Sequence, residues 1–88
     1  MKNIIECLVQ IEKAARNSDT AKVKAVIQST RKCLAGTAPK ELLGKLDGEL
    51  EVWQTKLSVI LKEPAGREGM ARHAKHWVEQ LRSLRGTQ

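Results

Sequence analysis

The sequence contains no tyrosine and no phenylalanine, and only two tryptophans, Trp53 and Trp77. Proteins that hold single-stranded nucleic acid generally stack its bases on exposed aromatic side chains. Both tryptophans fall on apolar stripes with helical spacing, so we expect them inside the protein core. The sequence therefore offers no aromatic platform for base stacking, and binding of single strands by stacking is not expected.

Cysteine and long apolar runs are also scarce. Only Cys7 and Cys33 are present, and both lie in segments of helical periodicity, where we expect reduced thiols packed as small apolar side chains. No segment approaches the roughly 20 apolar residues that span a membrane, and the first residues are too charged for a secretory signal. The sequence thus predicts no membrane contact and a cytoplasmic location.

Acidic side chains are outnumbered by basic ones. The 88 residues include 16 Lys and Arg against 10 Asp and Glu, a formal net charge of +6. This length predicts one domain over residues 1–88, with little room for a deep cleft that excludes water. The positive charge favours an acidic partner such as nucleic acid or an acidic protein surface, without choosing between them.

Apolar residues recur with helical periodicity along the whole chain and never alternate as they do in strands. Polar or glycine-containing turns divide the chain into four predicted helices, over about 3–16, 19–35, 37–63 and 64–86. We expect Asp19 to cap the second helix and Gly36 to end it. Short connections make neighbouring helices antiparallel, so the predicted fold class is all-α, a small four-helix bundle of antiparallel hairpins.

The third predicted helix contains Gly44 and Gly48. Glycine in a helix interior costs up to about 1 kcal/mol relative to alanine, and Asp47 could cap a restarted helix. Without a break, a helix over 37–63 would be longer than its neighbours. We therefore predict that this helix is kinked or broken near residues 44–48.

The sequence RHAKHWVEQLR, residues 72–82, concentrates the side chains with the strongest functional potential. On a helical wheel, Trp77 turns toward the core, whereas Arg72, Lys75 and Arg82 lie on the opposite half. Glutamates at suitable spacing predict ion pairs with these cations along the same helix. The main interpretation is a solvated face of mixed charge, and the alternative is a basic face for a phosphate backbone or an acidic partner.

His73 and His76 are three residues apart on this predicted helix, so both could reach one ligand. A zinc site needs three or four ligands, and the nearest further candidate, Glu79, continues around the helix and serves the predicted ion pairs. We therefore expect no metal and no cofactor. The histidines are expected to flank the core stripe.

Catalytic patterns are not found. A nucleophilic cysteine needs a base and an orienting group, and no glycine-rich phosphate loop is present. Glu49 and Glu51 are two residues apart, so they do not share a face of a helix. The sequence predicts a protein that is not an enzyme.

The expected function is a non-enzymatic interaction module, an adaptor, inhibitor or regulatory subunit that binds another protein with an acidic surface. The alternative is an accessory nucleic-acid-binding protein that contacts phosphates, and a homodimer with helices paired across two chains fits the same pattern. Residues 19–36 and 64–88 each carry a net charge of +3, so the second and fourth predicted helices hold most of the positive charge. Their basic residues form one basic side only if these two helices are neighbours. The residues expected to contact the partner are Lys24, Arg31, Arg72, Lys75 and Arg82.

Two short segments resemble parts of known folds. Residues 12–27, EKAARNSDTAKVKAVI, are similar to the helix–turn–helix of an ankyrin-type repeat, and HAKHWVEQLRSL is similar to the last helix of a small bundle in a transcription elongation factor. A single hairpin without a second copy does not form a repeat array. Neither resemblance assigns a function to a residue.

Overall fold

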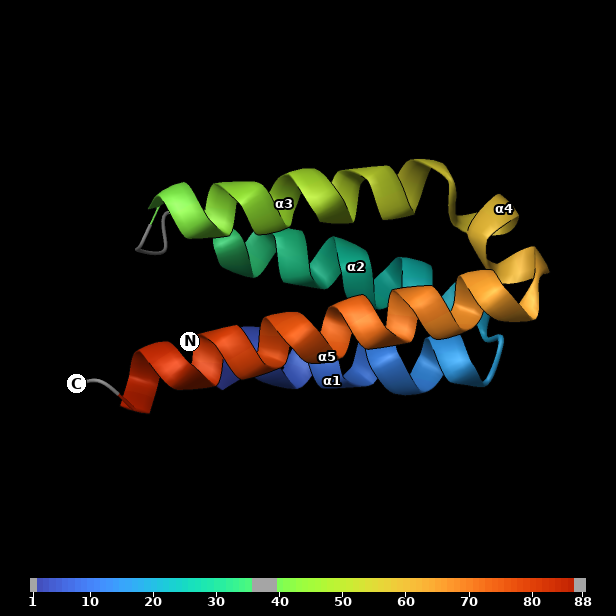
Figure 1. Cartoon of the computed structure of the whole chain (residues 1–88). Coiled ribbons are helices and arrows are strands. Elements are labelled where there is room, and N and C mark those ends of the chain that lie inside the picture. Colours follow the sequence, from blue (N-terminus) through green and yellow to red (C-terminus); the bar gives the residue numbers. More distant parts are fainter. Residues whose placement is uncertain (1, 36–39, 87–88) are drawn as a thin grey trace.

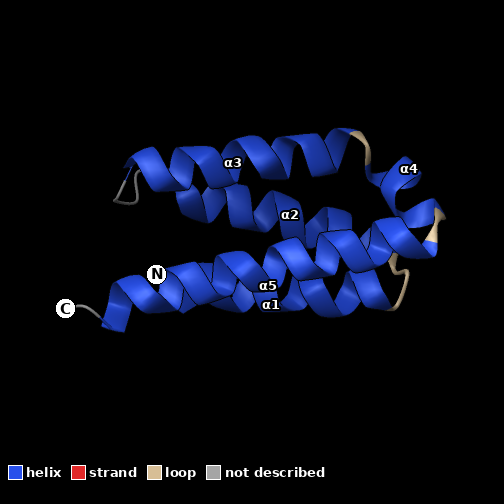
Figure 2. Cartoon of the chain, in the orientation of Figure 1, coloured by secondary structure: helices blue, strands red, loops and turns tan. Residues whose placement is uncertain are grey.

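The computed structural model describes residues 2–35 and 40–86, with the side chains of residues 3–35 and 40–83. This part of the chain is helical and contains no strand (Figures 1 and 2). The prediction of an all-α helical bundle is therefore confirmed. The elements are α1 Lys2–Arg16, α2 Thr20–Leu34, α3 Lys40–Thr55, α4 Leu57–Lys62 and α5 Pro64–Gly86.

Four long helices run in alternating directions, and the short α4 crosses one end of the bundle (Figure 1). Helix α1 packs closely on both α2 and α5, whereas α3 packs mainly on α2. The backbone of α3 approaches α5 less closely than that of α1 does. None of the described helices combines the length and the apolar character needed to span a membrane.

The core is continuous through the bundle and is built from the predicted stripes. Side chains such as Leu8, Ile27 and Leu50 are fully buried, and Trp53 and Trp77 are buried as expected. Polar groups are nearly absent from this core, since Thr30 is the one buried polar side chain among the described residues. Its hydroxyl donates to the carbonyl oxygen of Val26 at 2.7 Å, which satisfies it within α2.

The turn between α1 and α2 has the geometry expected of a helix C-terminus. Ser18 has a positive φ of 58°, and the backbone N–H of Asp19 donates to the carbonyl of Ala14 at 3.0 Å. Together with the bond from Ser18 N–H to Ala15, this is a Schellman motif. The Asp19 side chain accepts from the N–H of Lys22 at 3.2 Å, so the predicted cap of α2 is confirmed. The stop predicted at Gly36 lies outside the described residues.

The helix predicted over 37–63 is interrupted, but the break does not lie near residues 44–48. Helix α3 continues through Gly44 and Gly48 as far as Thr55, and the interruption comes at Lys56. Both glycines are on the exposed side of α3, so they cost only helix propensity. The opposite side buries an uninterrupted stripe, and this packing outweighs the glycines. That stripe consists of Leu43, Leu46, Leu50 and Trp53.

The chain turns sharply between α4 and α5. Glu63 is extended (φ −112°, ψ 146°), as expected for the residue before a proline, and Pro64 begins α5. The guanidinium of Arg67 donates to the carbonyl of Leu61 at 2.9 Å, which satisfies an end of α4. This corner redirects the chain so that α5 returns along α1.

Candidate functional site

Helix α5 separates its apolar and charged side chains as the sequence predicts. Ala74, Trp77 and Leu81 are buried against the bundle, and Arg72 and Lys75 are exposed on the outer side. Arg82 is exposed as well. The structure therefore places the three α5 cations of the predicted set on one helix face.

The ion pairs that we expected along α5 do not form. The carboxylate of Glu68 pairs with Arg16 of α1 at 3.6 Å, and not with Arg72. In the described part of the chain, Arg72, Lys75 and Arg82 have no ion-pair partner within 4.0 Å, and Glu79 has none either. The three cations thus remain available for an external partner.

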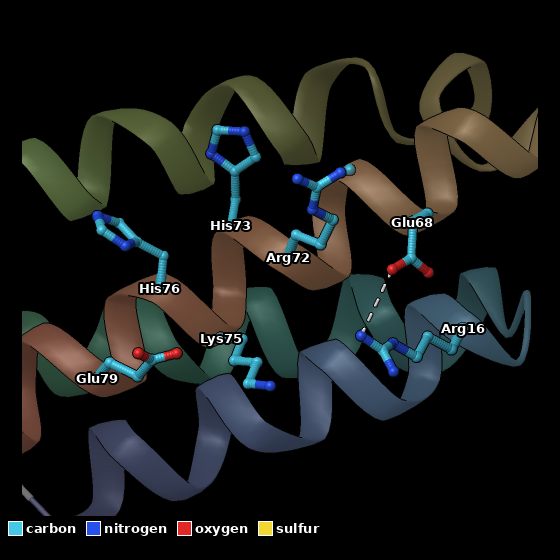
Figure 3. Close-up of a pocket in the computed structure, with 8 residues that line it drawn as sticks. Arg16, Glu68, Arg72, His73, Lys75, His76 and Glu79 are labelled. Atoms are coloured by element: carbon cyan, nitrogen blue, oxygen red, sulfur yellow. Dashed lines mark ion pairs between the residues drawn. The ribbon is translucent and has the colours of Figure 1, made fainter.

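A hollow of about 740 Å³ lies over this face, between the charged side chains of α5 and Arg16 of α1 (Figure 3). Lys75 extends toward α1 in this view, whereas His73 and His76 extend toward α3 (Figure 3). The side chains diverge and do not converge on one point. Such an arrangement suits contact with an extended surface better than the enclosure of a small molecule.

A smaller hollow of about 350 Å³ lies between α1 and α5 beside Arg82. Its apolar lining comes from Ile5 and the partly buried Val9. Glu6, Gln10 and Lys13 complete it. Sequence reasoning missed this hollow, although Ile5 and Val9, at a spacing of four outside the main α1 stripe, were a signal for it.

Glu49 connects α3 to α5 through one carboxylate. Its Oε2 accepts from the indole N–H of Trp77 at 2.9 Å, and its Oε1 lies 3.2 Å from Nδ1 of His73. No local pattern indicates this role, because Glu49 is far along the chain from Trp77 and His73. The contact joins α3 to α5, whose backbones approach each other less closely than those of α1 and α5 do.

The two histidines do not share a ligand site. His73 faces Glu49, whereas Nε2 of His76 lies 2.9 Å from the amide nitrogen of Gln80. Over residues 2–35 and 40–86, no group of three or more His, Cys, Asp or Glu side chains is placed to hold a metal ion. No disulfide joins Cys7 and Cys33, which are half-buried and pack against the core.

Arg31 of α2 makes an internal contact with α3. Its guanidinium donates to Asp47 at 2.8 Å and to Gln54 at 3.1 Å, and Glu51 lies 4.0 Å away. The hydrogen bond to Asp47 raises the pKa of Arg31 above its usual value. Arg31 thus stabilises the α2–α3 contact.

Lys24, the remaining predicted contact residue, is exposed on α2 without an ion pair. Helices α2 and α5 each pack on α1, and they are not neighbours as a single basic side would require. The structure brings Arg72, Lys75 and Arg82 together on α5 and places Lys24 on a separate surface.

No model of a known protein family, no curated protein and no solved structure matches this chain significantly.

Proposed function

We propose that the protein is a non-enzymatic protein–protein interaction module, and that its docking face is the outer side of α5 together with the adjoining edge of α1. We call this surface the α1/α5 face, defined by Arg72, Lys75, Arg82 and the hollow over Ile5 and Val9. The observation that carries the proposal is the combination of unpaired cations with a hollow beside Arg82 that is lined in part by Ile5 and Val9. Stable protein interfaces combine an apolar centre with a polar rim in this way.

The charge pattern of this face fits a protein better than a nucleic acid. Glu6 lies beside Arg82, and Glu68 and Glu79 lie among the cations of α5. A phosphate backbone is negative along its whole length, so it would be repelled by these carboxylates. A protein surface can instead place acidic groups opposite the cations and a basic or neutral group opposite each glutamate.

The dimensions of the face also fit a protein partner. Arg72 and Arg82 are separated by ten residues, which is about 15 Å along a helix. An acidic helix lying along α5 could meet all three cations while one apolar side chain enters the hollow over Val9. Recognition of a helix through such spaced anchors is a common mode of binding.

The first experiment is site-specific photo-crosslinking. A photoreactive amino acid at Lys75 is expected to capture a specific partner from the source cell extract, to be identified by mass spectrometry. The same group at Lys45 of α3 is the matched control, since Lys45 is also an exposed lysine on a helix but lies outside the α1/α5 face. Equal capture at both positions would show that contact is unspecific.

The identified partner is then titrated by calorimetry against two variants of equal charge change. The α5 triple variant (Arg72→Gln, Lys75→Gln, Arg82→Gln) is expected to weaken binding at least about tenfold, or 1.4 kcal/mol. The α2 triple variant (Lys22→Gln, Lys24→Gln, Lys32→Gln) is expected to leave this affinity within about threefold, because it preserves the α1/α5 face. Wild-type affinity in the α5 triple variant would refute the proposal.

Self-association provides a further arm of the test, because helices of two copies could pair through the same face. Sedimentation of the isolated protein is expected to show a monomer. A dimer that the α5 triple variant dissociates would identify the acidic partner of this face as a second copy of the chain.

A further inference from the structure

Helix α2 differs from the other long helices in its charge. Between Thr20 and Leu34 it carries four basic side chains and no acidic one. Arg31 is held by α3, which leaves Lys22, Lys24 and Lys32, all exposed and without an ion pair to any described residue. At about 100° per residue, Lys32 lies opposite the buried Val23, and the other two lysines lie about 80° to either side of it.

The carboxylates of neighbouring helices do not neutralise this surface. On α3, Asp47 and Glu51 lie against Arg31. On α1, Glu12 pairs with Arg16, and Glu6 lies in the hollow beside Arg82, on the side toward α5. None of the described carboxylates forms an ion pair with Lys22, Lys24 or Lys32, although that of Asp19 caps the helix beside Lys22. The outer side of α2 is therefore positive and lacks the interspersed glutamates of the α1/α5 face.

Large apolar side chains are missing from the same surface. Of the described residues, only Val52 and Val59 are large, apolar and exposed, and they belong to α3 and α4. The exposed positions of α2 between the lysines are small or neutral, namely Ala21, Ala25, Gln28 and Ser29. A protein interface needs an apolar centre, and a helix on a membrane surface needs apolar side chains to insert. Contact with phosphates needs neither.

We propose that the outer side of α2 binds the phosphate backbone of double-stranded nucleic acid through Lys22, Lys24 and Lys32. The duplex is favoured over single strands because α2 carries no aromatic side chain on which a base could stack. Lysine meets phosphates as a point charge and reads no base pattern here, so binding is independent of sequence. This site is additional to the α1/α5 face, and its existence does not depend on the proposed protein partner.

The test is a fluorescence-anisotropy titration of the full chain with a labelled random 24-base-pair DNA duplex between 50 and 200 mM salt. Three phosphate contacts predict that the logarithm of the affinity falls with the logarithm of salt concentration with a slope of about −2.7. The α2 triple variant is expected to lose at least about tenfold in affinity at 50 mM salt, with a slope near zero. A Lys→Arg version of the same three positions is expected to restore binding, since it keeps the charges.

The α5 triple variant is the matched control, because it removes the same number of charges from the other face. It is expected to bind the duplex within about threefold of the wild type. Equal losses in both triple variants would overturn the proposal in favour of the net charge of the whole protein. It would also be overturned if the duplex did not bind at 50 mM salt, or if vesicles of anionic lipid bound while the duplex did not.

Discussion

At the scale of single residues, the missing side chain of Gly66 allows α5 to begin against the backbone of α4. A Cβ atom at this position would overlap the carbonyl oxygen of Ile60, whereas a Cβ at Gly69 would meet nothing within 4 Å. Gly66→Ala is therefore expected to lower the free energy of unfolding by about 1–3 kcal/mol, because backbone must move to admit the methyl group. Gly69→Ala is the control, and urea denaturation is the measurement. Equal stability of the two variants would contradict this account of the corner.

Glu49 provides a second residue-scale prediction. Glu49→Ala leaves the indole N–H of Trp77 without its acceptor, and Trp77 is only 8% exposed. We expect a loss of about 1–3 kcal/mol in the free energy of unfolding. Glu49→Gln keeps an acceptor oxygen and is expected to lose less. Glu51→Ala is the matched control, since its carboxylate is mostly exposed and lies 4.0 Å from Arg31, so its removal costs little.

Ser18 holds a backbone conformation that favours glycine. Its φ of 58° is left-handed, which is unfavourable for a residue with a Cβ atom. Ser18→Gly relieves this strain at the end of α1 and is expected to raise the free energy of unfolding by roughly 0.5–1 kcal/mol. Ser18→Ala keeps the Cβ atom and serves as the control. Thermal unfolding at neutral pH would reveal the difference, and a lower midpoint for the glycine variant would refute it.

At the scale of elements, the two glycines of α3 are positions where substitution is expected to stabilise the protein. A Cβ atom at Gly44 or Gly48 meets nothing within 4 Å, and both positions are helical. Alanine at either position is expected to stabilise the protein by up to about 1 kcal/mol, through helix propensity alone. Chemical denaturation of the single variants and of the double variant would check this. Destabilisation by either alanine would show that α3 depends on a bend at the glycines.

The same helix shows what local sequence could and could not predict. Periodicity located α1, α2 and α5 to within about a residue, whereas the helix predicted over 37–63 is divided into α3 and α4. The apolar stripe of α3 was still predicted, because burial of Leu50 and Trp53 follows the helical repeat. The break was misplaced, since Gly44 and Gly48 are conspicuous in sequence but cost little on an exposed side. Nothing at Lys56 matches a strong helix-stop signal, and the turn there leads into α4, which crosses the end of the bundle (Figure 1).

At the scale of the whole molecule, sequence showed which helices are basic but not how they are arranged. Lys24 and Lys75 belong to different faces because α1 lies next to both α2 and α5, and this neighbour relation is a property of the tertiary fold. Arg31 was predicted to contact a partner, but the structure pairs its guanidinium with Asp47 of α3. Periodicity does not specify that α2 packs on α3, so this ion pair could not be predicted. The hollow beside Arg82 could not be located from the sequence either, since it forms between the first and last helices.

A single core predicts cooperative unfolding of the entire bundle. Trp53 belongs to α3 and Trp77 to α5, and both are buried in the same cluster. Loss of helix by circular dichroism and the change in tryptophan emission are therefore expected to coincide in urea. An emission change that precedes the loss of helix would show that α3 leaves first, which would contradict the prediction of one cooperative domain.

The close packing of α1 on α5 has a consequence for the synthesis of the protein on the ribosome. Helix α1 is made first, but the helix that covers much of its apolar side begins only at Pro64. At 5–20 residues per second, the interval is on the order of several seconds. During that time only α2 covers the apolar side chains of α1, namely Ile4, Leu8 and Ile11. The nascent chain is therefore most exposed to aggregation and to chaperones just before α5 emerges.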